Sequence, residues 1–268
     1  MILGNWITNI KHYTNLYKNA KPFEYVIINN FFDDSFANEL LEIIPSPLNN
    51  DINWHHYDNP IEQKFSLNKF DNYPKIQDLY SSLSKPDFIK LMKEITEINN
   101  LESDEYYNQD AYPNKGKLDM HLDYNIHPIS GKERRINLII YMNKDWKVDY
   151  GGSIELYDKD MNKIKEEMPL FNTAIIFRTS DISYHGLPKP IKCPNNIYRK
   201  SIAIYYVSEP RDNLIKRYKA EFYSQINQPV TNSLLELYKI RKNRLITTED
   251  LNNYYPNWRN DGNGFGRK

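Results

Sequence analysis

The sequence predicts a mainly β protein with flanking helices (α+β), in which short antiparallel strands close into a sandwich or barrel. The middle of the chain holds several short runs rich in β-branched and aromatic residues, separated by glycine- and proline-containing turns. Helical patterns stand on both sides of this region. Short strands at roughly even spacing favour antiparallel closure, of which the double-sheet jelly roll is one solution.

The N-terminal part begins with one strand and continues with two helices. Tyr25–Asn29 (YVIIN) is a β-branched run, and Asp34-Ser35 then predict a helix start. This helix should end just before Pro45, because proline disfavours helical geometry in the residue before it. Residues 54–60 (WHHYDNP) show no period and predict a loop or an irregular strand. A second helix is predicted from Pro86, with apolar residues along one face.

The predicted β core occupies the chain between residues 105 and 208. Its strands are expected at Tyr112–Asp123, Ile136–Met142, Ser153–Tyr157, Thr173–Phe177 and Ser201–Val207. After Pro210 the pattern is helical again, with Asp212 as a candidate cap. We therefore expect a core domain over residues 1–210, with an N-terminal strand and helices, and a C-terminal helical extension over residues 211–268. The extension ends in a polar tail, DGNGFGRK, expected to fray or to dock on a partner.

Bulk composition excludes several classes of partner. Lys+Arg and Asp+Glu balance at 35 each, so no global field draws the chain to nucleic acid or to an anionic membrane. The N-terminus lacks an apolar run of signal-peptide length, and no stretch approaches the roughly 20 apolar residues of a membrane helix. The single cysteine, Cys193, suits a reducing compartment, so we expect a cytoplasmic protein. Composition does not predict the oligomeric state.

Two histidines and one aspartate form a candidate metal site. His121 and Asp123 stand two apart at the end of a predicted strand, and such residues share a face. His185 follows the predicted strand Thr173–Phe177 after a turn. Two histidines and one carboxylate make the facial triad typical of non-haem Fe(II) oxygenases, which leaves open positions on the metal. A polar strand end would explain an HxD motif that stood alone. Here a second histidine, His185, follows later in the chain and supplies the third ligand.

The open positions suit a 2-oxo acid, which can chelate iron through two oxygens, and O₂. The distal carboxylate of a co-substrate such as 2-oxoglutarate needs a fixed cation. Arg199 can offer a bidentate fork, and Ser201 shares its face and adds a hydroxyl. Lys200 points the other way if the strand is regular, and the small Ala203 leaves room beside a ligand.

A second strand contributes to the same predicted pocket. Asn137, Ile139 and Tyr141 alternate onto one face, where the Tyr141 hydroxyl can complete the carboxylate site. For the substrate side we single out Tyr112, Arg135 and the loop of Trp54. The alternatives stay open: Arg134 and Arg135 read equally well as a solvated turn, and Trp54 reads most simply as a core or interface aromatic.

These motifs resemble the 2-oxoglutarate oxygenases of the prolyl-hydroxylase type. The resemblance covers roughly Tyr25 to Pro210 and is carried, in order, by HxD (121–123), YMNKDW (141–146) with Gly151-Gly152, His185 and RxS (199–201). It implies a double-stranded β-helix with N-terminal helices, Fe(II) on His121, Asp123 and His185, and 2-oxoglutarate and O₂ as co-substrates. It also implies that Arg199 and Tyr141 bind the co-substrate carboxylate.

The resemblance further implies hydroxylation of an amino-acid side chain, with proline in a protein or peptide as the first expectation. In related halogenases a small residue replaces the carboxylate, so Asp123 favours hydroxylation. The Pro-rich loop LPKPIKCPNN (187–196) departs from the family pattern, as does the approach to the HxD strand, which reads Tyr112-Pro-Asn-Lys-Gly. A hydroxylase of a small metabolite or sugar is the alternative substrate class. A jelly-roll binding protein without turnover is the alternative function.

Overall fold

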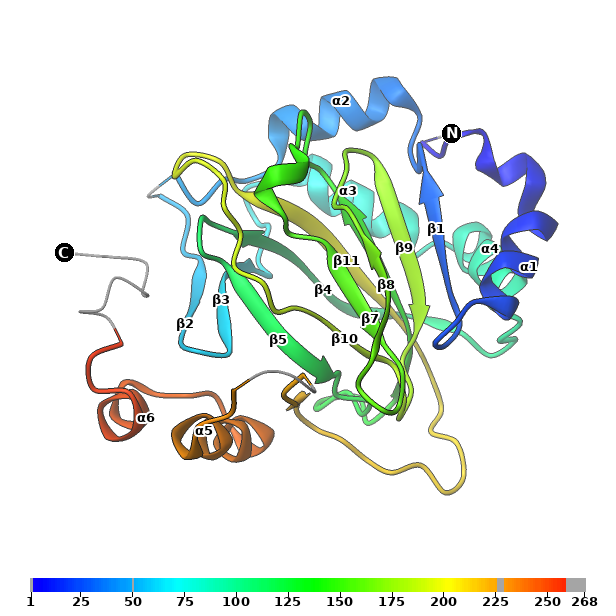
Figure 1. Ribbon diagram of the computed structural model, residues 1–268. Coiled ribbons are helices and arrows are strands. Elements are labelled where there is room, and N and C mark those ends of the chain that lie inside the picture. Colours follow the sequence, from blue (N-terminus) through cyan, green and yellow to red (C-terminus); the bar gives the residue numbers. More distant parts are fainter. Residues whose placement is uncertain (1, 50, 226–228, 259–268) are drawn as a thin grey trace.

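A curled antiparallel sheet is the centre of the molecule (Figure 1). The structure is a computed structural model that describes residues 2–49, 51–225 and 229–258. In chain order its strands are β1 (Tyr25–Asn29), β2 (His55–Asp58), β3 (Glu62–Leu67), β4 (Glu102–Tyr112), β5 (Lys117–Leu122), β6 (Glu133–Tyr141), β7 (Ile154–Tyr157), β8 (Lys163–Glu167), β9 (Thr173–Arg178), β10 (Tyr184–Leu187), β11 (Arg199–Ser208) and β12 (Glu221–Phe222).

The strands pair in the order β1-β9-β6-β11-β4-β3-β5-β10-β7-β8, with β2 added to β3 and β12 added to β5. Within the described residues the strands pair antiparallel, as in the pairs β11 with β4 and β6 with β9. The sheet curls over on itself (Figure 1), and side chains of β3, β4, β5, β6, β7, β10 and β11 line a cavity inside it. The predicted mainly β fold with flanking helices is confirmed, and it is that of a double-stranded β-helix.

Four N-terminal helices cover the outer side of this sheet (Figure 1). Asp33, one residue before the expected cap, begins α2 by accepting hydrogen bonds from the amides of Ser35 (3.0 Å) and Phe36 (3.4 Å). Two of the other helices carry proline in their first turn, where it removes no needed donor. The helices are α1 (Ile10–Asn19), preceded by a 3₁₀ turn at Asn5–Asn9, α2 (Asp34–Ile43), α3 (Pro74–Leu83) and α4 (Pro86–Thr96).

The main core lies between these helices and the sheet. Alternate side chains of β6 point into this core and into the cavity on the other face of the sheet. Each fully buried Ile or Leu contributes about 1.5–3 kcal/mol relative to exposure. The even-numbered residues Ile136, Leu138 and Ile140 belong to the core cluster, whereas Asn137, Ile139 and Tyr141 line the space inside the sheet. One strand therefore anchors the helices on one side and furnishes a cavity on the other.

Several expected elements need correction. The run predicted from Tyr112 to Asp123 is two strands, β4 and β5, because a turn at Pro113–Gly116 separates them, with Lys115 at φ 66°. The segment WHHYDNP belongs to a hairpin, β2–β3, and β8 and α3 were not expected.

The chain beyond residue 208 also differs from expectation. Asp212 caps no helix; the described part of the chain after β11 runs without helix to α5 (Asn232–Asn243), which Thr231 caps through the Leu234 amide (3.1 Å). A short helix, α6 (Thr248–Tyr254), follows, and the polar tail lies outside the described residues. Among the described residues, no helix combines the length and apolarity that crossing a membrane requires.

Candidate metal centre and adjoining cavity

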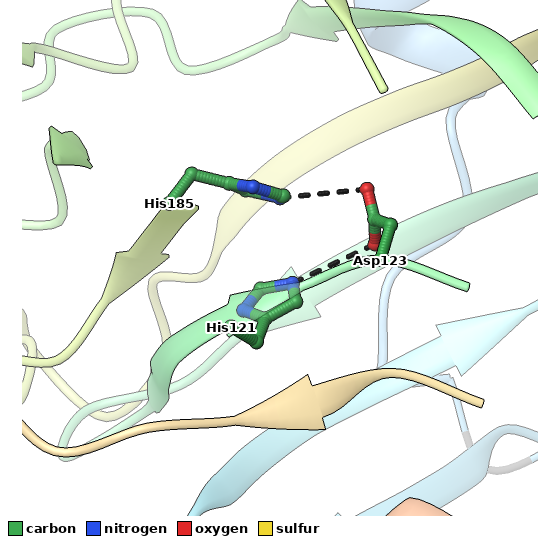
Figure 2. A group of neighbouring side chains, drawn as sticks. All are labelled: His121, Asp123 and His185. Atoms are coloured by element: carbon green, nitrogen blue, oxygen red, sulfur yellow. Dashed lines mark ion pairs between the residues drawn. The ribbon is translucent and has the colours of Figure 1, made fainter. Parts of the chain in front are cut away.

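Two neighbouring strands bring the two histidines together. β5 and β10 pair antiparallel with His121 opposite His185, and cross-strand partners point to the same face. Their ring centroids lie 4.3 Å apart. Asp123 follows directly after β5 and turns its carboxylate toward both rings (Figure 2). The register of the two strands thus brings together two histidines that lie 64 positions apart in the sequence.

The ligand atoms of these three residues face a common point (Figure 2). The Nε2 atoms of His121 and His185 each lie 3.6 Å from an Asp123 carboxylate oxygen. One ligand atom from each of the three residues lies within 4.8 Å of the others. Each Nδ1 lies 2.9 Å from a backbone carbonyl oxygen, that of Asp119 for His121 and that of Ser183 for His185. Because a carbonyl only accepts, each Nδ1 donates to it, and Nε2 is the ring nitrogen that each histidine turns toward Asp123.

The pKa shifts of His185 and Asp123 favour the binding of a cation. Burial and the neighbouring His121 lower the pKa of His185 to about 4, so the imidazole is neutral near pH 7. Burial opposes the charge of Asp123, but Arg134 and the two imidazoles outweigh it and hold the pKa of this carboxyl well below its usual range. One carboxylate and two imidazoles are a ligand set that fits a divalent metal such as Fe(II).

A network inside the sheet fixes the Asp123 carboxylate. The Asn137 side-chain amide donates to Asp123 Oδ2 at 2.6 Å, and an Arg134 Nη2 lies 3.6 Å from the same oxygen. Arg134 Nε in turn donates to Asn137 Oδ1 at 2.7 Å, and its guanidinium lies 3.5 Å from the Tyr205 ring centroid. Asn137, which we expected in the co-substrate pocket, thus lines the cavity and orients the carboxylate.

A cavity of about 100 Å³ adjoins these three residues and contains a buried arginine. Arg199 is only 4% exposed, and its guanidinium lies 4.8 Å from the Tyr141 ring centroid and 5.1 Å from that of Tyr112. Its Nε donates to the Gly152 carbonyl oxygen at 2.7 Å, but it pairs with no carboxylate of the described chain. A buried cation without a counter-charge is costly, so the chemistry of Arg199 suits an anionic ligand.

Two tyrosines stand beside this arginine as proton donors. Burial, partly offset by Lys64, raises the pKa of Tyr112 to about 12, and burial also raises that of Tyr141. Both hydroxyls therefore keep their protons near neutral pH. The Tyr141 hydroxyl is buried, and its polar neighbour among the described residues is the Arg199 guanidinium, which partly offsets the effect of burial on its pKa. A buried hydroxyl and a buried guanidinium side by side offer hydrogen-bond donors that suit a carboxylate.

The geometry of β11 agrees with the expected alternation. Arg199, Ser201, Ala203 and Tyr205 line the cavity, and Lys200 does not. Ser201 pairs with Tyr141 of β6, and Arg199 pairs with Tyr112 of β4. Gly152, at φ 80°, makes room for the arginine: a Cβ there would lie 3.2 Å from Arg199 Cδ.

Of the three residues expected on the substrate side, only Tyr112 lines this cavity. Trp54 packs into the main core against Phe65, with ring centroids 6.4 Å apart. Arg135 lines a separate pocket of about 560 Å³ and donates to Ser208 Oγ at 3.0 Å.

A β-bulge explains why Arg134 replaces Arg135 in the cavity. Strict alternation from Asn137 would turn Arg135 inward. In the ladder with β11, however, Tyr206 pairs with Ile136 and Val207 with Arg134, which leaves Arg135 without a partner. The extra residue reverses the alternation, as bulges beside functional sites often do.

Sequence reasoning also missed an ion pair that lines the cavity. Lys64 Nζ, on β3, lies 2.8 Å from Asp110 Oδ2, on β4. Burial opposes the charge, yet Asp110 holds the pKa of Lys64 well above its usual value. No strand was predicted at Lys64, so no pattern pointed to it. Tyr205, by contrast, continues the inward series of β11 and could have been found by counting on from Ala203.

The comparison with protein families bears on this centre directly. Residues 107–207, which include the three candidate ligands and Arg199, match the model of the 2OG-Fe(II) oxygenase superfamily. This part of the chain therefore resembles the 2OG-Fe(II) oxygenases. The family name carries both an iron(II) cofactor and 2-oxoglutarate, so the resemblance, the enzyme class and the cofactors inferred from the sequence are confirmed.

A mouse protein shares sequence with a short part of this chain. A prolyl 3-hydroxylase of Mus musculus, OGFOD1, is 35% identical over 57 residues, which are 19% of this chain and 10% of that protein. The chain therefore matches only a tenth of that relative's length.

Two solved structures share the fold. A prolyl hydroxylase of Trichoplax adhaerens, solved with a hypoxia-inducible-factor oxygen-degradation-domain peptide, has a TM-score of 0.58 at 20% identity and covers 76% of this chain and 94% of its own. A Pseudomonas putida prolyl-4-hydroxylase has a TM-score of 0.55 at 10% identity, covering 74% of this chain and 100% of its own. At these identities the structures establish the fold alone.

Proposed function

We propose that this protein is an Fe(II)- and 2-oxoglutarate-dependent dioxygenase that hydroxylates an unactivated carbon of a proline residue in a protein or peptide. The observation that carries the proposal is the grouping of His121, Asp123 and His185 within 4.8 Å, beside a cavity that holds the unpaired, buried Arg199. A metal site and an anion site side by side are what an iron centre with a chelating 2-oxo acid requires.

In this proposal the chain holds and orients the reacting groups. His121, Asp123 and His185 bind Fe(II), and Asn137 and Arg134 keep the carboxylate in its orientation. Bound iron with 2-oxoglutarate and O₂ supplies the oxidising power for attack on a C–H bond. His121, Asp123 and His185 would hold the metal, and the adjoining cavity would take the co-substrates.

Arg199 binds the distal carboxylate of 2-oxoglutarate, with Tyr141 and Ser201 as further donors. A guanidinium offers paired donors that match a carboxylate, and burial strengthens each of these bonds. The Tyr141 hydroxyl, beside this guanidinium, then donates to the same carboxylate. Tyr112, on the other side of the guanidinium, closes the pocket.

The substrate side is supported by an aromatic surface next to Asp123. Tyr205 and Tyr124 both lie close to the Arg134 guanidinium, with their ring centroids 3.5 and 4.7 Å from it. Aromatic faces are a common surface for proline. The prolyl 3-hydroxylase relative and the peptide in the Trichoplax adhaerens structure support a proline-containing peptide over a free metabolite.

The proposal also covers organisation and location. We assign the oxygenase domain to residues 1–210 and a C-terminal extension to residues 211–268. The only cysteine, Cys193, is free and buried, which supports a reducing compartment such as the cytoplasm.

The function is tested by incubating the purified chain with Fe(II), 2-oxoglutarate and a panel of proline-containing peptides. Mass spectrometry should show the gain of one oxygen, taken from ¹⁸O₂ when that gas is supplied, and matched peptides with alanine at that position should gain none. The His185→Ala variant serves as the inactive control. Oxygen incorporation that persists in this variant, or that requires no 2-oxoglutarate, would overturn the proposal.

A further inference from the structure

We propose that residues 211–223, here called the strap, position all three candidate metal ligands from the outer side of the site. This inference rests on the proposed function, because it assigns a role toward the metal that the triad would hold. The strap leaves β11, crosses below the sheet and returns along β5 as β12 (Figure 1). None of its residues lines the cavity. Its members are therefore positioning residues and not catalytic residues.

Phe222 supports the ring of His121. In the pairing of β12 with β5, Phe222 stands opposite His121, and the two rings stack at a centroid distance of 5.2 Å and an angle of 26°. The next amide, that of Tyr223, donates to the Met120 carbonyl oxygen at 2.8 Å and holds the register. His121 thus lies between His185 on one side and Phe222 on the other. Its ring has little freedom to rotate.

The C-terminal helix supports this contact in turn. Tyr238 of α5 stacks on Phe222, with ring planes 14° apart, and the Arg241 guanidinium lies 5.4 Å from the Phe222 ring centroid. The Tyr238 hydroxyl donates to Asp119 Oδ2 at 2.9 Å. Asp119 also provides the carbonyl oxygen that accepts from His121 Nδ1. Both the ring and its hydrogen-bond acceptor are therefore tied to the chain beyond residue 210.

Arg217 connects the other two candidate ligands. Its side chain is 4% exposed, and its Nε donates to the Asp123 carbonyl oxygen at 3.2 Å. The same guanidinium donates to the Ser180 carbonyl oxygen at 3.0 Å and pairs with Asp181. Its backbone amide donates to Asn125 Oδ1 at 2.7 Å, which fixes the strap beside Asp123.

The bond from Arg217 to Ser180 reaches His185 through one turn. Ser183 Oγ accepts from the Ser180 amide (2.9 Å) and donates to the Ser180 carbonyl oxygen (3.1 Å). The Ser183 carbonyl oxygen accepts from His185 Nδ1. One buried guanidinium therefore links the backbone of Asp123 to the turn that sets the His185 ring. Groups that orient metal ligands in this way change metal affinity by about 10- to 100-fold when they are removed.

The test compares metal binding by four full-length variants with that of the unaltered chain. Phe222→Leu removes the ring that stacks on His121, and Arg217→Met removes the guanidinium that bonds the backbone of Asp123 and Ser180. Tyr218→Leu and Arg211→Met are the matched controls: Tyr218 is an exposed strap aromatic, and Arg211 is a strap arginine that pairs with Glu133, away from the three ligands. Co(II) is the probe, because its visible spectrum reports the geometry of its ligands.

Phe222→Leu and Arg217→Met should bind Co(II) about 10- to 100-fold more weakly and with an altered spectrum, and the controls should stay within about twofold of the unaltered chain. Circular dichroism and thermal unfolding of the metal-free proteins verify that each variant is folded. A merely structural effect would lower the unfolding temperature and leave the Co(II) spectrum unchanged. Tyr238→Phe, which removes one hydroxyl, and Arg217→Lys, which keeps the charge, provide milder forms of the same changes and should show smaller losses.

The possible failures separate the two proposals. If the unaltered chain does not bind Co(II), or His121→Ala binds it equally well, the proposed function is wrong and the role of the strap is wrong with it. If binding depends on His121 but is unchanged in folded Phe222→Leu, Arg217→Met and Tyr238→Phe, only the inference about the strap is overturned.

Discussion

Replacing Arg199 by alanine should weaken 2-oxoglutarate binding severely while leaving the metal site intact. The side chain is 4% exposed and meets no carboxylate of the described chain, so in this account its charge is neutralised only by the co-substrate. Removing one partner of a buried hydrogen-bonded charge pair costs about 2–5 kcal/mol. At 1.4 kcal/mol per tenfold, the dissociation constant should rise about 30- to 4,000-fold.

The assay is an anaerobic titration of the Fe(II)-loaded protein with 2-oxoglutarate, followed by the visible charge-transfer absorption of the chelate. Lys200→Ala is the matched control, because the neighbouring cation lies outside the cavity. Its dissociation constant should change by less than about threefold, a shift typical of a residue without a direct contact. Loss of binding in Lys200→Ala with normal binding in folded Arg199→Ala would refute the assignment of the carboxylate site.

Three further predictions concern the same centre. Arg134→Met should weaken Co(II) binding about 10- to 100-fold in an equilibrium titration, because it removes a contact that orients the Asp123 carboxylate. Arg135→Met, next to the bulge, should leave Co(II) binding unchanged, and equal effects of the two substitutions would contradict the role of Arg134. Gly152→Ala should raise the dissociation constant of 2-oxoglutarate, because the new methyl group displaces Arg199, and unchanged binding would show that the arginine can shift freely. Saturating Mn(II) should raise the unfolding temperature of the unaltered chain in a thermal scan but not that of His185→Ala, and a similar rise in both would place the metal elsewhere.

Local sequence patterns were sufficient for the parts of the site that lie on regular strands. His121 and Asp123 share a face at a strand end, and the inward series from Arg199 to Ala203 follows from alternation alone. The fold class followed from short strands at even spacing between helical segments. These features are local, so a periodicity of two was enough to find them.

The parts that were missed depend on events that no local pattern shows. The bulge in β6 exchanges Arg135 for Arg134, and a single unpaired residue has no signature in composition. For Trp54 the sequence left a core position and a substrate contact open, and the residue, which directly precedes the β2–β3 hairpin, packs into the core. Lys64 reaches the cavity from the same unpredicted hairpin.

The C-terminal segment was misjudged for a related reason. Asp212 has the chemistry of a helix cap, yet the chain there follows tertiary contacts: Arg217 bonds the backbone of Asp123, and Phe222 stacks on His121. A two-residue strand such as β12 is too short to show alternation. Its position is set by the partner strand β5, which lies about a hundred residues earlier in the chain.

The central claim is that His121, Asp123 and His185 hold one ferrous ion beside the Arg199 cavity. Anomalous diffraction at the iron absorption edge, from crystals grown anaerobically with Fe(II) and 2-oxoglutarate, measures this directly. The account predicts one anomalous peak between the two Nε2 atoms and the Asp123 carboxylate, with 2-oxoglutarate extending from it to Arg199. A peak bound by other residues, or co-substrate density away from Arg199, would contradict it.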